Sequence, residues 1–242
     1  MTIGVFDSGI GGLTVLKKLI MAYPDHEYIY YGDTLNLPYG TKSKETLAVL
    51  AEQIINFLLA KGAQILVIAC GTISSNLYEQ LKNKYKIPII DVLNPVVNYI
   101  KAQGLKNIGI FATPMTISSH TFTKKIGFPV KEIACPLFVP LIESGKINTL
   151  ACERAIKKYL KELGPVDNII LGCTHYPLLK NALAKYTSAN LIDMADGVVK
   201  SISLDKKTKQ KISLYFSKET ANLRNNVKNI IDQDYELKIL EN

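Results

Sequence analysis

The sequence predicts an α/β fold with two similar series of elements, each forming a mostly parallel sheet flanked by helices. Three observations support this prediction. Short apolar runs typical of buried strands alternate with longer amphipathic stretches along almost the whole chain. The order of these elements repeats once, and polar or glycine-rich turns follow several of the strands.

The first series contains four expected strands joined by three helices. The strands are placed at residues 3–6, 27–31, 64–70 and 88–92. The helices are placed at about residues 13–22, 43–61 and 74–85. The strand runs are rich in Val, Ile, Leu and Tyr, which favour a buried sheet.

The second series repeats this layout further along the chain. Its strands are placed at residues 107–111, 131–135 and 168–173, with helices from about residue 117 and at 151–163. A tail adds a strand at 211–216 and a helix at about 219–232, and we expect it to return to the first unit because the second is already complete. The predicted lobes are residues 1–93 with about 207–242, and about 94–206.

The composition is that of a folded globular protein, with 48% hydrophobic and 21% charged side chains among 242 residues. No stretch approaches the roughly 18 apolar residues of a membrane-spanning helix, and the first residues do not resemble a signal segment. The four cysteines lack close pairing, which is typical of free thiols in a reducing compartment. We therefore expect a cytoplasmic protein without a membrane span, in which Cys135 and Cys152 serve in packing.

The net charge is basic, since 29 basic and 21 acidic residues give a formal charge of +8. Such a charge favours acidic ligands in a general way. Much of the excess is local, because five lysines lie between residues 200 and 211. Neither an arginine cluster nor an aromatic stacking surface accompanies them, so nucleic acid is not an expected partner.

Two cysteines occupy matching positions in the two series. Cys70 ends the strand at 64–70 and Cys173 ends the strand at 168–173, and each is followed within two residues by Thr72 or Thr174. Ligands bind outside the carboxyl ends of strands in open α/β sheets. Two thiols on opposite sides of one substrate suit racemisation, because one removes a proton from one face and the other delivers a proton to the opposite face.

A glycine turn, Gly9-Ile10-Gly11-Gly12, follows the first strand. It does not match the dinucleotide-binding pattern, because the third glycine of that pattern would fall on Thr14. A strand, a glycine turn and a helix N-terminus are nevertheless expected to hold a small anion such as a carboxylate. Asp7 and Ser8 at this strand end have two open interpretations, ligand contact and capping of the loop.

Two other kinds of site use the same residues. Zinc would have Cys70, Cys173 and His175 as ligands, but the spacing differs from that of structural zinc sites and the sequence offers no fourth ligand. A Cys-His hydrolase would pair Cys173 with His175 or with the more distant His120. The hydrolase scheme leaves the matching Cys70 unexplained, and no metal is expected.

Five segments together resemble the bacterial glutamate racemases. They are VFDSGIGG at 5–12, YGD at 31–33, PYG at 38–40, CPLFVPLIE at 135–143 and LGCTHYPL at 171–178. They occur in the family's order, and the similarity extends to about residue 197. The resemblance implies two pseudo-symmetric lobes with the active site between them. It also implies a cofactor-independent isomerase that interconverts L- and D-glutamate, supplies D-glutamate for peptidoglycan and forms a homodimer.

The resemblance also implies roles for individual residues. Cys70 and Cys173 would be the acid/base pair, with Asp7 supporting Cys70, and with His175 and Glu143 supporting the chemistry at Cys173. The residues expected to contact glutamate are Asp7, Ser8, Tyr39, Gly40, Gly71, Thr72, Thr113, Thr116, Thr174 and His175.

One position departs from the family. Gly71 stands where the family usually has asparagine, so an amide that would touch the amino-acid end of the substrate is missing. Asn76 is the nearby candidate to supply an amide, and Gly71→Asn is expected to tighten glutamate binding. Two alternative functions stay open, a related racemase for aspartate or another amino acid, and a non-catalytic binding protein on the same fold.

Overall fold

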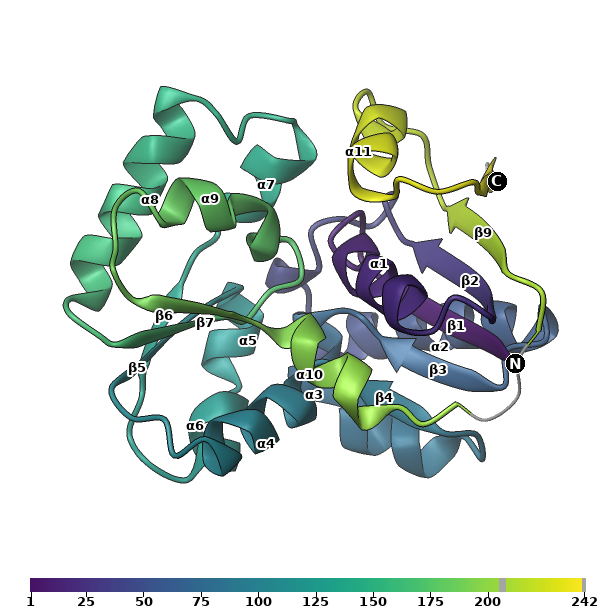
Figure 1. The fold of residues 1–242 in the computed structure, drawn as a ribbon, viewed down its shortest axis with the longest axis horizontal. Coiled ribbons are helices and arrows are strands. Elements are labelled where there is room, and N and C mark those ends of the chain that lie inside the picture. Colours follow the sequence, from purple (N-terminus) through teal and green to yellow (C-terminus); the bar gives the residue numbers. More distant parts are fainter. Residues whose placement is uncertain (205–207, 241–242) are drawn as a thin grey trace.

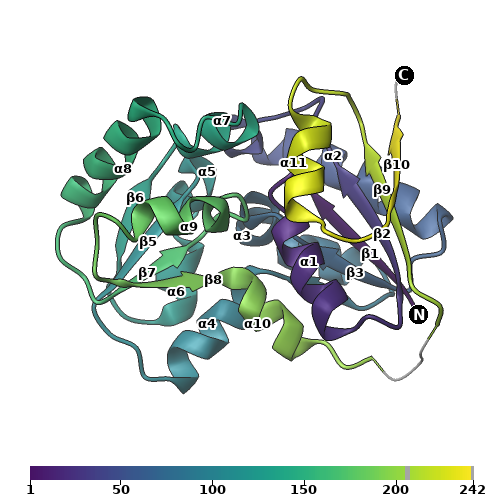
Figure 2. The same cartoon turned by 45° about the horizontal axis from the view of Figure 1, so that its top comes forward.

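The computed structural model describes residues 1–204 and 208–240 and contains two parallel sheets flanked by helices. Figure 1 shows the sheets side by side, each with its own helices, and Figure 2 gives the same arrangement from a second direction. The predicted α/β class with two lobes is confirmed. The order of strands β2-β1-β3-β4 in the first sheet is repeated as β6-β5-β7-β8 in the second.

The first sheet has six parallel strands in the order β10-β9-β2-β1-β3-β4. Their bounds are Thr2–Asp7 (β1), Glu27–Gly32 (β2), Ile65–Ile68 (β3), Ile89–Asp91 (β4), Lys211–Phe216 (β9) and Glu236–Ile239 (β10). The helices beside this sheet are Leu13–Ala22 (α1), Lys44–Ala60 (α2), Gly71–Lys84 (α3) and Leu223–Ile230 (α11), with a short 3₁₀ turn at Tyr39–Thr41. These elements are called the first lobe below.

The second sheet has four parallel strands in the order β6-β5-β7-β8. Their bounds are Ile108–Ala112 (β5), Lys131–Ala134 (β6), Asn168–Leu171 (β7) and Asn190–Asp193 (β8). The accompanying helices are Pro114–Ser118 (α5), Thr121–Ile126 (α6), Phe138–Glu143 (α7), Leu150–Leu163 (α8) and Lys180–Leu183 (α9), with a 3₁₀ turn at Tyr176–Leu179. These elements are called the second lobe.

Two helices lie where the lobes meet. Helix α4 (Leu93–Ala102) packs on α10 (Met194–Ser201), and α10 also packs on α1. The Nζ atom of Lys18 on α1 lies 2.6 Å from an oxygen of Asp193 and 2.5 Å from one of Asp196. The predicted lobe boundaries at 93–94 and about 206–207 stay a prediction, and residues 205–207 lie outside the described part of the chain.

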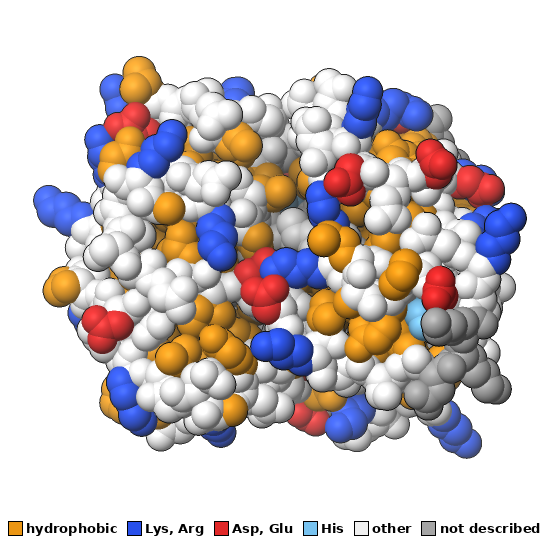
Figure 3. Space-filling view, in the orientation of Figure 1, with side chains coloured by type: hydrophobic (Ala, Val, Ile, Leu, Met, Phe, Trp, Pro, Cys, Tyr) orange, Lys and Arg blue, Asp and Glu red, His pale blue; other side chains and the backbone are white. Residues whose placement is uncertain are grey.

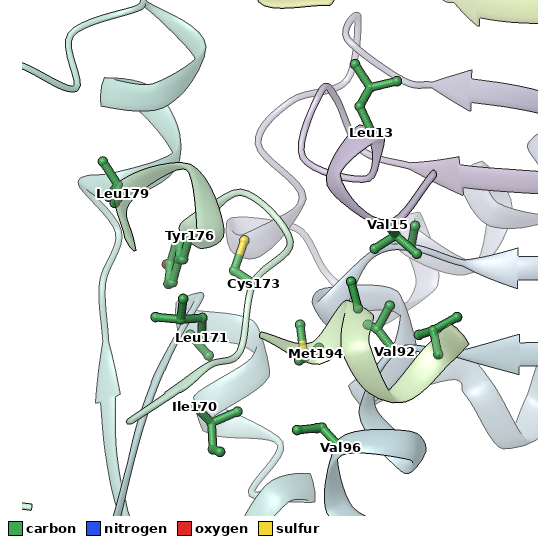
Figure 4. Close-up of a cluster of buried hydrophobic side chains, with 14 of the residues drawn as sticks. Leu13, Val15, Val92, Val96, Ile170, Leu171, Cys173, Tyr176, Leu179 and Met194 are labelled. Atoms are coloured by element: carbon green, nitrogen blue, oxygen red, sulfur yellow. The ribbon is translucent and has the colours of Figure 1, made fainter. Parts of the chain in front are cut away.

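One hydrophobic core runs through both lobes. Figure 4 shows Val15 of α1 and Val92 on one side and Ile170 of β7 on the other, with Met194 of α10 between them. Strands β1, β3 and β7 are buried along nearly their whole length, because helices cover both faces of each sheet. This shared core packs the two lobes against each other.

Several elements differ from the sequence-based expectations. The helix expected from about residue 117 is instead the two short helices α5 and α6, because Thr113 and Pro114 start a helix earlier and His120 adopts a left-handed conformation between them. Helix α3 begins at Gly71 rather than 74, and the tail helix is shorter than 219–232. The sequence reading missed the helices α4, α7, α9 and α10 and the strands β8 and β10; Pro95 lies in the first turn of α4, where proline is tolerated.

The surface carries mixed charges. On the face shown in Figure 3, lysine and arginine side chains are scattered among acidic and apolar ones. Within the described residues, none of the helices is both long and apolar enough to cross a membrane.

Candidate active site

Residues that follow strands of both sheets line one narrow cavity between the lobes. From the first lobe come Asp7, Ser8, Tyr39, Gly40, Cys70, Gly71 and Thr72. From the second come Thr113, Cys173, Thr174 and His175. The carboxyl ends of the two sheets therefore meet at this cavity, and most of the predicted site residues are brought together there.

The cavity is small, with a volume of about 40 Å³. In this measure a water molecule needs about 10–15 Å³, so the space is far below what an amino acid occupies. A larger cavity of about 700 Å³ lies at the junction of α1, α4 and α10. None of the predicted site residues lines the larger cavity, so we assign the active site to the smaller one, in a closed arrangement of the lobes.

Cys70 lies at the N-terminus of α3, where it is the residue preceding the first helical turn. Burial raises the pKa of its thiol, and the neighbouring Asp7 raises it further. The main-chain N–H groups of Ile73 and Thr72 act in the opposite direction, because they stabilise the thiolate. The position thus holds a protonated thiol beside groups that support its ionised form.

Asp7 ends β1, and its carboxylate is held by the glycine turn. Its Oδ2 atom accepts hydrogen bonds from the main-chain N–H of Gly12 at 2.8 Å and of Gly9 at 3.4 Å. Burial raises its pKa, although His175 and the main-chain N–H groups favour the charged form. Its Oδ1 atom is buried without a hydrogen-bond partner among the described residues. Asp7 is therefore a candidate to hold or pass a proton next to Cys70.

The glycine turn, expected to hold a small anion such as a carboxylate, holds two carboxylates of the chain itself in this structure. Asp7 occupies the main-chain N–H groups of Gly9 and Gly12, and the N–H of Ile10 donates to Oε1 of Glu143 at 3.1 Å. The turn binds carboxylates as its geometry suggests, but they are the chain's own.

Cys173 follows β7 and begins a row of three side chains in hydrogen-bond contact. Its Sγ atom lies 3.8 Å from Nδ1 of His175, and Nε2 of His175 donates to Oε1 of Glu143 at 2.7 Å. Burial lowers the pKa of His175, but its hydrogen bonds to Cys173 and Glu143 outweigh burial and raise the pKa well above its ordinary value. Glu143 does not line the cavity and lies behind His175, in the position of a supporting group.

A row of hydroxyl groups crosses from one lobe to the other. Thr72 Oγ1 and Thr113 Oγ1 are 2.9 Å apart, and Thr113 Oγ1 is 3.0 Å from Thr116 Oγ1. Thr116 is fully buried and does not line the cavity, so it contacts Thr113 rather than the site itself. Ser75 joins the same row at 3.4 Å from Thr116, and the sequence reading missed it.

Two further residues were missed. Cys135 lines the cavity, although the sequence assigned it to packing; burial raises the pKa of its thiol, and its Sγ donates to the carbonyl of Ile133. The sequence did contain a signal for Cys135, because this residue begins the segment 135–143, one of the five that resemble the glutamate racemases. Asp33 accepts a hydrogen bond from the hydroxyl of Tyr39 and so positions that ring at the cavity.

Gly71 allows a close contact between the lobes, which the sequence analysis did not anticipate. A Cβ atom at this position would lie 2.5 Å from the main-chain carbonyl oxygen of Gly172 in the other lobe. The expectation that Gly71→Asn improves binding therefore does not fit this closed arrangement. Asn76 does not replace the amide either, because its side chain donates to the Thr72 carbonyl and to Ser75 and does not line the cavity.

The geometry gives less support to the two alternative sites, a Cys-His hydrolase that uses His120 and a zinc site. His120 lies at the start of α6, where its exposed ring is 3.1 Å from Glu132, outside the cavity that contains Cys173. Over residues 1–204 and 208–240, no three His, Cys, Asp or Glu side chains are grouped so that they could hold a metal ion.

Comparison with known proteins identifies the family of this chain. A family model described as Asp/Glu/Hydantoin racemase matches residues 3–202. The chain belongs to this racemase family. It is 40% identical over 247 residues to glutamate racemase of Aquifex aeolicus (strain VF5), covering 99% of this chain and 97% of that protein.

Solved structures of the racemase family share the fold. Glutamate racemase of Francisella tularensis subsp. tularensis SCHU S4 in complex with D-glutamate is 32% identical, with a TM-score of 0.89 over 99% of this chain and 97% of that one. Glutamate racemase of Aquifex pyrophilus is 37% identical, with a TM-score of 0.83 over 99% and 98% of the two chains.

The raised pKa of Asp7 predicts a pH-dependent effect on stability. Because the pKa in the folded protein lies above the ordinary 3.8, ionisation destabilises the folded state as the pH rises above that value. Asp7→Asn should therefore raise the denaturant midpoint relative to the parent protein at pH 8, and by less at pH 4. Asp234→Asn, at an exposed carboxylate, is the control and should show no such trend. A variant that is less stable than the parent at pH 8 would contradict the assignment.

Proposed function

We propose that this protein is a glutamate racemase that interconverts L- and D-glutamate without a cofactor, with Cys70 and Cys173 as its two bases. The observation that carries the proposal is the pair of buried thiols at the carboxyl ends of opposite sheets, in one cavity. Each thiol has its own proton partner, Asp7 for Cys70 and His175 for Cys173. The product D-glutamate would serve peptidoglycan synthesis in the cytoplasm.

The reaction needs a proton to leave one face of Cα and another to arrive on the opposite face. In one direction the thiolate of one cysteine takes the α-proton, the electron pair stays on Cα, and the thiol of the other cysteine donates its proton to the opposite face. The second cysteine is left as the thiolate, so the same site is set for the reverse reaction. No other bond forms or breaks. Between turnovers, Asp7 and His175 exchange protons with the two thiols and so restore their starting protonation states.

The difficult step is holding negative charge beside the substrate carboxylate. Hydroxyl groups, main-chain N–H groups and exclusion of water stabilise such charge in a buried site. Thr174 Oγ1 and Asp7 Oδ1 are buried at this cavity without a partner in the described chain, which supports contacts of these atoms with a polar substrate. Ser8, Thr72 and Thr113 add further hydroxyl groups.

Glutamate is favoured as the substrate over aspartate or another amino acid. The relatives at 32–40% identity that extend over nearly the whole chain are named glutamate racemases, and one of them was solved with D-glutamate. Two thiols with intact proton partners favour an enzyme over a non-catalytic binding protein. Turnover of a panel of amino acids separates these possibilities.

We also propose that the protein forms a homodimer. Met21 and Leu150 are apolar side chains that are 66% and 70% exposed, of the kind that subunit interfaces cover. Light scattering of the purified protein would show one mass for a dimer and half that mass for a monomer, and the monomer would refute this part.

The two-base scheme predicts the effect of removing either thiol. Cys70→Ala and Cys173→Ala should each lower kcat for racemisation by about 10²–10⁴-fold or more, because each removes a base or an acid from the reaction. The measurement is the rate of change in optical rotation of D- and of L-glutamate.

Cys152→Ala is the matched control, since Cys152 lies on α8, is buried and does not line the cavity. It should retain turnover close to that of the parent protein. Full activity in either of the two site variants would refute the scheme.

A further inference from the structure

A buried carboxyl group at the end of β2 connects three parts of the first lobe. Asp33 follows β2 directly and is only 3% exposed. Its Oδ2 atom accepts a hydrogen bond from the hydroxyl of Tyr39 at 2.5 Å, and its Oδ1 atom accepts one from the hydroxyl of Ser217 at 2.8 Å. Its main-chain N–H donates to the carbonyl of Asp7 at 3.0 Å. One residue therefore joins a wall of the cavity, the tail of the chain and the residue beside Cys70.

The tail of the chain reaches this place because its strand β9 pairs with β2, beside which it lies in Figure 1. The register sets Phe216 opposite Gly32, so Ser217 and Asp33 are the first residues to leave the two strands. The hydroxyl oxygen of Ser217 accepts a hydrogen bond from the main-chain N–H of Leu35 at 2.9 Å. The proton of this hydroxyl is therefore available to donate to Asp33.

Further hydrogen bonds hold the segment that leads from β2 to the cavity, residues 33–40. The hydroxyl of Thr34 donates to the main-chain carbonyl of Lys218 at 2.6 Å and accepts from the N–H of Lys218 at 3.1 Å. The side-chain amide of Asn36 donates to both carboxyl oxygens of Asp33, at 2.9 and 3.0 Å. The segment is therefore fastened to the tail before it reaches the cavity.

Tyr39, near the end of this segment, is buried and lines the cavity. Burial and the neighbouring Asp33 raise the pKa of its hydroxyl, so the hydroxyl stays protonated and donates to the carboxyl group. A Cβ atom at the adjacent Gly40 would lie 2.7 Å from Thr113 of the second lobe, so this end of the segment fits closely. The hydroxyl of Tyr39 therefore fixes the segment, whereas proton transfer belongs to the two thiols.

We propose that Ser217, in the C-terminal tail, is a positioning residue of the active site and acts through Asp33 on Tyr39. This inference rests on the proposed function for its place in catalysis. None of the described tail residues 208–240 lines the cavity, so the effect of the tail passes through one carboxyl group that two hydroxyl groups share. The tail thereby governs substrate binding rather than proton transfer, because it holds a wall of the cavity and neither thiol.

The experiment is a double-mutant cycle between Ser217→Ala and Tyr39→Phe, which remove the two hydroxyl groups and leave Asp33 in place. Initial rates with D-glutamate give kcat and KM for the parent protein, both single variants and the double variant. Each single variant should raise KM by about fivefold or more, the effect of one hydrogen bond, with kcat within about twofold of the parent. A loss of folded protein would instead lower kcat and leave KM unchanged.

The double variant tests whether the two hydroxyl groups act through the same carboxyl group. Its KM should stay close to that of the single variant with the larger effect, because the loss of either bond already releases the segment. The shifts in the midpoint of denaturant unfolding should likewise fail to add in the double variant.

Ser213→Ala is the matched control. Ser213 lies in β9, four residues before Ser217, and is also buried. It is not among the described residues that donate to the carboxyl group of Asp33. Both kinetic parameters of this variant should equal those of the parent protein.

Each other result overturns the proposal. An unchanged KM in Ser217→Ala, with or without a lower kcat, would mean that the tail serves the fold alone. Effects on KM that multiply in the double variant would mean that the two hydroxyl groups act independently, and a raised KM in Ser213→Ala would assign the effect to the whole strand. The unfolding cycle needs no turnover, and midpoint shifts that add would refute the shared carboxyl group. A parent protein that does not racemise glutamate would count against the proposed function and not against this network.

Discussion

The rest of the site depends on the close approach of two sheet ends. Four glycines of the first lobe each face a group of the second lobe where a side chain would not fit: Gly9 against Glu143, Gly11 against His175, Gly40 against Thr113, and Gly71 against Gly172. These contacts come from three separate segments of the first lobe, the turn with Gly9 and Gly11, the segment around Gly40 and the start of α3 at Gly71, so the close fit extends along the edge of the lobe. Because the lobes approach so closely, two thiols that lie far apart in the sequence share one narrow, buried cavity.

Similar frameworks carry different chemistry in the two lobes. The order of strands is repeated, and each cysteine follows the third strand of its series, β3 or β7. The partners nevertheless differ, since Cys70 has a carboxyl group and helix amides while Cys173 has a histidine backed by a carboxylate. A racemase acts on mirror-image substrates with L-amino acids alone, so its two halves are not required to match. The repeated strand order places a thiol at the end of each sheet, and the loops place a different titratable side chain beside each thiol, Asp7 near Cys70 and His175 near Cys173.

Local patterns predicted much of this structure, and long-range contacts account for what was missed. Apolar runs and the turns after them located most strands, and therefore both cysteines at strand ends. The short strand β8 and the alternating, half-exposed β10 were missed, because neither has a strong pattern of its own. The use of the glycine turn could not be predicted, since Ile10 and its partner Glu143 are 133 residues apart. Gly71 illustrates the same limit: the sequence indicates a lost amide, whereas the fold shows a contact with Gly172.

The central claim is racemisation by two thiols on opposite faces of one substrate, and proton NMR in D₂O tests it most directly. The purified protein is mixed with D-glutamate without added cofactor, and the α-proton signal and the handedness of the product are followed from the first turnovers. The account predicts that L-glutamate appears with deuterium at Cα while the remaining D-glutamate keeps its proton, because different groups remove and deliver the proton. Exchange of the remaining D-glutamate faster than L-glutamate forms would indicate a single base and contradict the account, as would the absence of any L-glutamate.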